Sequence, residues 1–258
     1  MKTALTIAGS DPSGGAGLQA DLKTFHQHGV YGMAAVTLLT VQNTQSVTRV
    51  EVLAPDLVRQ QIEAVLADLP PGAIKTGALG NTAIIEMLAS QRFNAPLVVD
   101  PVMVSKHGHA LLAEDAQQAL RSKLLPVTTL LTPNTLEAAA LLGTPVNTLE
   151  QAEAAAAALS KLGPKAVLVK GGHLTGPEAI DVLYVDGRLI HLSGPRIDTK
   201  HTHGTGCTYS AAITAGLAKG QTLEDSVRAA KAWLTRALAT APGLGHGIGP
   251  VNHFASLD

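Results

Sequence analysis

The segment Gly204-Thr205-Gly206-Cys207 has the composition that points most directly to chemistry in this chain of 258 residues. Two glycines separated by one residue allow a tight turn that aims successive backbone N–H groups outward. A helix predicted over residues 208–218 follows at once. Its N-terminus adds unpaired N–H donors and the positive end of its dipole. The combination predicts a cradle for phosphate charge, and the alternative is an ordinary tight turn before a helix.

Cys207 is placed to act as a base or nucleophile, because the first turn of a helix lowers a thiol pKa and favours the thiolate. The alternative is a small buried side chain that only packs. Cys207 is also the only cysteine, so the chain can form neither an intramolecular disulfide nor a cysteine-based zinc site. His107 and His109 lack the helical pairing with a nearby glutamate that is typical of zinc sites.

Polar and glycine-rich residues follow one apolar run after another along the chain. In an open α/β sheet, ligands bind at the carboxyl ends of the strands, so these residues locate a candidate site. They are Gly9-Ser10-Asp11, Gln42-Asn43, Thr76-Gly77, Asp100-Pro101, Thr132-Pro133-Asn134 and Lys170-Gly171-Gly172.

The elements that must position these residues alternate between short apolar strands and helical patterns. The apolar runs predict burial on both faces, as in a parallel sheet covered by helices. Strands are expected over residues 5–8, 33–41, 73–76, 96–100, 129–132 and 166–170. Asp186-Gly187 between two apolar runs predicts a hairpin over residues 181–192, at an antiparallel edge of the sheet. No linker or repeat divides the chain, so we expect one domain, residues 1–258.

Several side chains have both a structural and a functional interpretation. Asp100 ends a predicted strand, where a carboxylate is costly unless it is paired, solvated or bound to a metal. Asn134 and Glu137 have the spacing of a helix capping box, which needs no ligand. Lys170 at a strand end could reach anionic oxygens, although such lysines are more often solvated.

The composition excludes some classes of function. The net charge is -1 and aromatic residues make up 3%, which argues against nucleic acid or an anionic membrane as a partner. The N-terminal apolar run is broken by Gly9, Asp11 and Pro12, so it favours a buried strand over a signal peptide. We expect a cytoplasmic protein.

The motifs as a set resemble the hydroxymethylpyrimidine and phosphomethylpyrimidine kinases of thiamine synthesis, within the ribokinase-like superfamily. Gly204-Thr205-Gly206-Cys207 resembles their anion-hole motif, in which most ribokinases and pyridoxal kinases have Asp at the position of Cys207. Residues 8–21 are similar to the opening motif of the family. The further matches are Gln42-Asn43-Thr44, Lys75-Thr76-Gly77, Asp100-Pro101-Val102-Met103, Thr132-Pro133-Asn134 with Glu137, Lys170-Gly171-Gly172-His173 and Gly247-Ile248-Gly249-Pro250-Val251.

This resemblance implies a ribokinase-like three-layer sandwich that uses ATP and Mg²⁺, commonly as a homodimer, with the hairpin over residues 181–192 as a candidate contact. It implies phosphorylation of 4-amino-5-hydroxymethyl-2-methylpyrimidine and then of its monophosphate. Cys207 would be the base, and the other catalytic groups would be Gly204, Thr205, Gly206 and Lys170. The implied substrate contacts are Gly9, Asp21, Gln42 and Val104, the nucleotide contacts Asn134, Lys170, Thr205 and Gly206, and the residues near the metal Asp100 and Glu137.

Two alternatives stay open at this point. A pyridoxine or pyridoxal kinase acts on a ring and carbinol of similar size, although Cys207 in place of Asp argues against it. A ligand-binding regulatory protein could keep the fold without the activity. The intact residues Gly204, Cys207, Asp100 and Glu137 argue against that second alternative. The loop over residues 105–109 is a candidate flap over the substrate, with Gly108 as a hinge.

Overall fold

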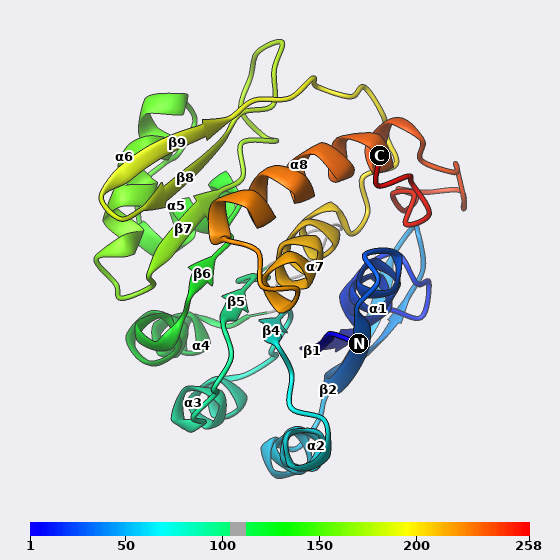
Figure 1. Ribbon diagram of the computed structural model, residues 1–258, viewed down its shortest axis with the longest axis vertical. Coiled ribbons are helices and arrows are strands. Elements are labelled where there is room, and N and C mark those ends of the chain that lie inside the picture. Colours follow the sequence, from blue (N-terminus) through cyan, green and yellow to red (C-terminus); the bar gives the residue numbers. More distant parts are fainter. Residues whose placement is uncertain (104–111) are drawn as a thin grey trace.

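One sheet of nine strands runs through the protein, and the computed structural model describes residues 1–103 and 112–258 around it (Figure 1). The strands are β1 (Thr3–Ser10), β2 (Tyr31–Gln42), β3 (Val47–Val52), β4 (Ala73–Thr76), β5 (Leu97–Val99), β6 (Leu130–Leu131), β7 (Ala166–Val169), β8 (Asp181–Val185) and β9 (Arg188–Leu192). Their order in the sheet is β3-β2-β1-β4-β5-β6-β7-β8-β9. The predicted Val104 and the candidate flap at residues 105–109 lie outside the described residues.

The six central strands are parallel, and each edge of the sheet is antiparallel; the parallel strands are β2, β1, β4, β5, β6 and β7. The hairpin β8–β9 turns at Asp186 and Gly187, which both have positive φ, so the predicted antiparallel edge is confirmed. The opposite edge, formed by β3 pairing with β2, was missed from the sequence. β3 is almost wholly exposed and carries Arg49 and Glu51, so it lacks the apolar run by which the other strands were recognised.

Helices cover both faces of the sheet and make three layers (Figure 1). On one side lie α1 (Gly17–Gln27), α7 (Thr205–Ala218) and α8 (Leu223–Ala239). On the other lie α2 (Pro55–Asp68), α3 (Thr82–Ser90), α4 (Glu114–Ala119), α5 (Thr135–Leu142) and α6 (Leu149–Ser160). A π-helical turn (Leu120–Leu124) and a 3-10 turn (Leu125–Val127) follow α4. The predicted three-layer sandwich is therefore the observed fold. Among the described helices, none combines the length and the apolar character that crossing a bilayer requires.

The strands separate two cores because successive side chains point to opposite faces. Leu5, Ile74 and Val99 pack with the helices α2 to α6. Ala4, Ala73 and Val98 face α1, α7 and α8. Trp233 is the largest fully buried side chain. A residue that lies an even number of positions from Ala4, Ala73 or Val98 in the same strand points to the same face of the sheet. Polar residues at such positions near the strand ends therefore lie beneath α1 and α7.

Candidate active site

Gly204 is the residue immediately before α7, its N-cap, and has a left-handed conformation with φ of 74°. A Cβ at this position would lie 1.7 Å from the carbonyl oxygen of Gly15, so only glycine allows the two backbones to approach this closely. The helix then starts at Thr205, earlier than the predicted residue 208, and no side chain caps it. The first-turn N–H groups of a helix have no preceding carbonyl partner, so those of Gly206 and Cys207 are available to an anion.

Lys170, Asp100 and Gly206 meet at this helix start, as the strand-end pattern predicted. Lys170 Nζ lies 2.8 Å from Asp100 Oδ1. A Cβ on Gly206 would lie 3.1 Å from Lys170 Nζ and 3.6 Å from Asp100 Oδ2, so the charged pair faces the backbone of the helix start. Ser210 of α7 donates to Asp100 Oδ2 across 3.3 Å, and Thr132 donates to Asp100 Oδ1 across 3.3 Å.

Asn134 and Glu137 form the predicted capping box at the start of α5. Asn134 Oδ1 accepts from the N–H of Glu137 at 2.9 Å, and Glu137 Oε2 accepts from the N–H of Asn134 at 2.7 Å. The same Glu137 oxygen lies 4.0 Å from Lys170 Nζ, so the capping side chain also faces the charged pair, and its role near a metal stays a prediction. Burial, together with the nearby charge of Asp100, raises the pKa of Glu137 despite the opposing effect of Lys170.

The carboxylate oxygens of Asp100 and Glu137 are the kind of ligand that a hard cation such as Mg²⁺ prefers, but the two side chains do not form a complete metal site by themselves. Asp100 and Glu137 both approach Lys170, which stands between them in the described structure. No group of three or more His, Cys, Asp or Glu side chains suited to a metal occurs within residues 1–103 and 112–258. Mg²⁺ is commonly held by only one or two carboxylates, with water and substrate phosphates completing its shell, so a pair of carboxylates suffices.

Asp21 and Lys75 form an ion pair with no exposed surface, across 2.9 Å. Thr6 donates to the same carboxylate oxygen, Asp21 Oδ2, at 2.6 Å, whereas Oδ1 has no hydrogen-bond partner among the described residues. Burial by itself would lower the pKa of Lys75, but the negative charges around it, Asp21 first, raise that pKa to about 12. Substrate binding by Asp21 stays a prediction, and its unpaired Oδ1 is the atom that would carry it.

The Cys207 thiol lies in the first turn of α7, accepts a hydrogen bond from the N–H of Gly17 and interacts with Lys75. The residue is partly exposed, yet loss of water around the thiol raises its pKa to about 11. Lys75 acts against this rise, while Asp21 and Asp100 add to it. The expectation of a lowered thiol pKa is therefore wrong for the free protein, because burial of the thiol raises its pKa more than Lys75 and the N–H of Gly17 lower it, and two nearby carboxylates add to the rise.

Gln42, at the end of β2, reaches across to the loop before α7. Its amide nitrogen lies 3.3 Å from His203 Nε2, and the same ring nitrogen lies 2.7 Å from Asp11 Oδ2. The predicted substrate residue Gly9 is the last residue but one of β1, and an added Cβ there would lie 2.5 Å from the Leu38 side chain. The candidate ring site is thus bounded by backbone and by this polar cluster.

Sequence reasoning assigned no chemical role to Lys75, Asp11 or His203, although Lys75 and Asp11 lie within the quoted motifs. The alternation of β4 places Lys75 on the same face as Ala73, under α7, and this was the signal that could have identified it. Asp11 and His203 are 192 residues apart, so no local pattern joins them.

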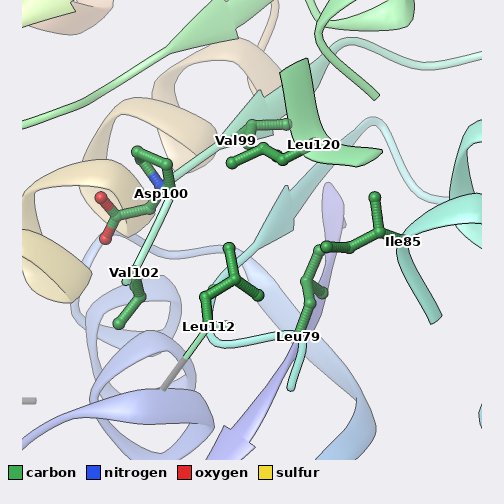
Figure 2. A pocket seen from close by; sticks show the side chains of 9 residues that line it. Leu79, Ile85, Val99, Asp100, Val102, Leu112 and Leu120 are labelled. Carbon is green, nitrogen blue, oxygen red and sulfur yellow. The ribbon is translucent and has the colours of Figure 1, made fainter. Parts of the chain in front are cut away.

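A cavity of about 10 Å³ lies beside Asp100, on the side of the sheet away from α7. Figure 2 shows apolar side chains around it, among them Val99, Ile85 and Leu120, with the Asp100 carboxylate turned away from them. A space of this size holds at most one water molecule, so it is a packing feature beneath the site and no substrate pocket.

The fold is that of a ribokinase-like kinase, and the comparisons with known proteins specify the family. The family model described as phosphomethylpyrimidine kinase matches residues 11–252. A hydroxymethylpyrimidine/phosphomethylpyrimidine kinase from Streptomyces coelicolor is 48% identical, over 98% of this chain and 94% of its own length. The chain belongs to the phosphomethylpyrimidine kinase family, as its motifs predicted.

Solved structures agree with this assignment. A phosphomethylpyrimidine kinase from Clostridium difficile superposes with a TM-score of 0.82 at 41% identity, covering 92% of this chain and 100% of that one. An ADP complex of pyridoxal kinase from Bacillus subtilis superposes with a TM-score of 0.91 at 39% identity, covering 99% and 98% of the two chains.

The first prediction concerns the buried pair. We expect Lys75→Met to lower the free energy of unfolding by about 3–5 kcal/mol, since it leaves the Asp21 carboxylate buried without a counter-charge. The double variant Lys75→Met/Asp21→Leu should recover most of that loss. Arg49→Ala, at an exposed ion pair, is the matched control and should cost less than about 1 kcal/mol. Urea denaturation measures all three, and equal costs for Lys75→Met and the double variant would contradict the interpretation.

The second prediction concerns the only thiol. With a pKa of about 11, alkylation of Cys207 by iodoacetamide should keep rising by about tenfold per pH unit up to about pH 10. In the urea-denatured chain the same cysteine should level off near pH 9, because a free thiol has a pKa of about 8.5. The dependence of the alkylation rate on pH reports the thiol pKa, whereas limited access of iodoacetamide to Cys207 would lower the rate equally at every pH. A plateau below pH 9 in the folded protein would refute the raised pKa.

Proposed function

We propose that this protein transfers the γ-phosphoryl group of ATP to the hydroxyl of 4-amino-5-hydroxymethyl-2-methylpyrimidine, and then phosphorylates the resulting monophosphate to the diphosphate. The observation that carries the proposal is a phosphate cradle at Gly204–Cys207, facing Lys170 and Asp100, in a chain that resembles kinases of this name along its whole length. An ATP-dependent reaction of this kind belongs in the cytoplasm.

The cradle supplies positioning and charge, which are the main requirements of phosphoryl transfer. The N–H groups of Gly206 and Cys207 and the ammonium of Lys170 would receive the phosphoryl oxygens, with Asn134 beside them. The N–H of Thr205 lies 3.3 Å from the carbonyl oxygen of Thr202 and would have to give up that partner to join them. Gly204 allows the turn that exposes these donors. Asp100 and Glu137 would hold Mg²⁺, directly or through water, and the ion would neutralise phosphate charge.

Cys207 has a different importance in the two steps. In the first, the carbinol must lose a proton as the new P–O bond forms, and Cys207 is the proposed acceptor. Forming its thiolate at pH 8 from a pKa of about 11 costs about 4 kcal/mol, which is a small part of an enzyme's catalytic effect. In the second step the acceptor is an ionised phosphate, so no base is required. Lys75 is placed to stabilise the thiolate formed in the first step.

The ring would lie against Gly9, Asp21, Gln42 and Val104. Gln42 offers both an amide donor and an amide acceptor, which suit the ring nitrogen and exocyclic amine of an aminopyrimidine. Pyridoxal phosphorylation is the second candidate, and the similarity to the pyridoxal kinase from Bacillus subtilis favours it. A regulatory protein without activity is the remaining alternative.

The third prediction separates these candidates by ADP release with ATP and Mg²⁺. We expect turnover of both the pyrimidine carbinol and its monophosphate. Cys207→Ala should lower kcat/KM for the carbinol by about 10²–10⁴, the range for a lost acid–base group, and for the monophosphate by less than about tenfold. Cys207→Ser keeps a side chain of similar size, so it separates the loss of the thiol from the loss of side-chain volume. Equal losses of kcat/KM in both steps would show that Cys207 has only a structural role. Turnover of pyridoxine or pyridoxal alone would favour the second candidate. Binding of the ring compounds without turnover would favour the regulatory protein.

The fourth prediction concerns assembly, which we propose to be a homodimer formed through β2 and β3. Leu39 and Val41 alternate along β2 and are 48% and 56% exposed, next to the sheet edge. The β8–β9 edge carries one exposed large apolar side chain among its described residues, Leu189. Light scattering should give a dimer for the wild type and for Leu189→Asp, and a monomer for Leu39→Asp/Val41→Asp. Loss of the dimer in Leu189→Asp alone would instead favour the β8–β9 hairpin.

A further inference from the structure

Asp11, Gln42 and His203 come from three distant segments and meet at one nitrogen atom. His203 Nε2 lies 2.7 Å from Asp11 Oδ2 and 3.3 Å from the amide nitrogen of Gln42. Asp11 and His203 are both 3% exposed, so this contact is made away from water. A neutral imidazole nitrogen either carries a hydrogen or accepts one, and therefore it cannot serve a carboxylate and an amide N–H in the same way.

Asp11, and not Gln42, determines whether His203 Nε2 carries a hydrogen. Its carboxylate accepts from the hydroxyl of Ser13 at 2.7 Å and from the N–H groups of Ser13 at 2.9 Å, Gly15 at 3.2 Å and Ala16 at 2.8 Å. Burial alone would raise the pKa of Asp11, but these donors and His203 lower it, so the group is an anion. An anion at 2.7 Å requires a donor, so Nε2 carries its hydrogen and directs it at Asp11.

The Gln42 amide then has to present its oxygen to His203. With its nitrogen there, two N–H donors would face each other, and a half-turn about the last side-chain bond exchanges the two groups at no cost in shape. The half-turn also satisfies the other end of the amide. Thr40 Oγ1 lies 3.2 Å from that end and donates its hydrogen to the carbonyl of Ser10 at 2.9 Å, so it is free to accept from the amide.

We propose that His203, held by Asp11, is a positioning residue that fixes the orientation of the Gln42 amide and thereby sets the preference of the site for an aminopyrimidine edge over a pyridine edge. In the fixed orientation Gln42 keeps one N–H and one oxygen lone pair for a ligand, in a set order. An aminopyrimidine offers a ring nitrogen beside an amine, which complements that order. Pyridoxine has no donor on a carbon next to its ring nitrogen. Because the carbinol must face α7, the ring cannot turn over to match a reversed amide.

This inference rests on the proposed function for the identity of the ring, and a binding experiment separates the two. The dissociation constants of 4-amino-5-hydroxymethyl-2-methylpyrimidine and of pyridoxine are measured by calorimetry without ATP. His203→Phe keeps a ring packed against Gly15 but removes Nε2. We expect it to weaken the aminopyrimidine by about tenfold, the value of one hydrogen bond, and pyridoxine by less than about threefold. His191→Asn, at an exposed histidine of β9, is the matched control and should change neither.

A double-variant cycle shows whether His203 acts through Gln42. In a Gln42→Leu background, His203→Phe should no longer alter the ratio of the two dissociation constants. An unchanged ratio in His203→Phe alone, or the same loss of ratio in both backgrounds, would overturn the proposal. A wild type that binds the aminopyrimidine but does not phosphorylate it would refute the proposed function and leave this inference standing.

The wild type provides a test that does not depend on the folding of any variant. Nitrogen-15 NMR of the histidine rings should show His203 protonated at Nε2 at pH 7.5, with His203→Phe used only to assign the signal. A neutral ring with its hydrogen on Nδ1 would overturn the proposal, since Nε2 would then accept from Gln42 and leave the amide in the other orientation.

Discussion

Charged side chains buried at the carboxyl ends of the parallel strands constrain the rest of this structure. Three lysines lie there, Lys75 wholly buried and Lys170 and Lys231 mostly buried. Each contacts one aspartate at 2.8–2.9 Å: Lys75 with Asp21, Lys170 with Asp100 and Lys231 with Asp181. An unpaired buried charge is costly, so each pair must form together with the strands and helices that carry it. The sheet order places these pairs under α1, α7 and α8, and so determines where an anion can be received.

The balance of these charges explains the properties of the site better than any single motif does. Around Cys207 the cations Lys75 and Lys170 are each matched by a carboxylate, so little net field favours a thiolate in the free protein. Phosphates arriving at the start of α7 would draw on Lys170 and on the helix N–H groups. The free site is thus electrically balanced, and under the proposed function it would receive a strongly charged ligand by exchanging partners.

Sequence reasoning worked where the signal is local or periodic. The turn at Asp186 and Gly187, the capping box of Asn134 with Glu137 and the collection of polar residues at strand ends were predicted on that basis. It failed for β3, because its exposed residues lack an apolar run. It also failed for the thiol pKa of Cys207, since that value depends first on burial of the thiol and then on Asp21 and Asp100, which other elements bring close. The sequence cannot show which distant carboxylate a lysine will face, because that choice depends on strand order and face.

The close approach of Gly204 to Gly15 also has a consequence for biosynthesis. His203 is joined to Gly249 by a backbone hydrogen bond, and the N–H of Ile248 donates to Thr44, so the N-terminal loops are completed by the last residues of the chain. Contacts between such distant segments form late, because their loop-closure entropy must be overcome first. A nascent chain that has not yet reached Gly204 lacks one side of this close contact, and it gains the backbone bonds to Thr44 and His203 only when residues 248 and 249 have been added. The proposed phosphate cradle is therefore among the last parts of the fold that synthesis can complete.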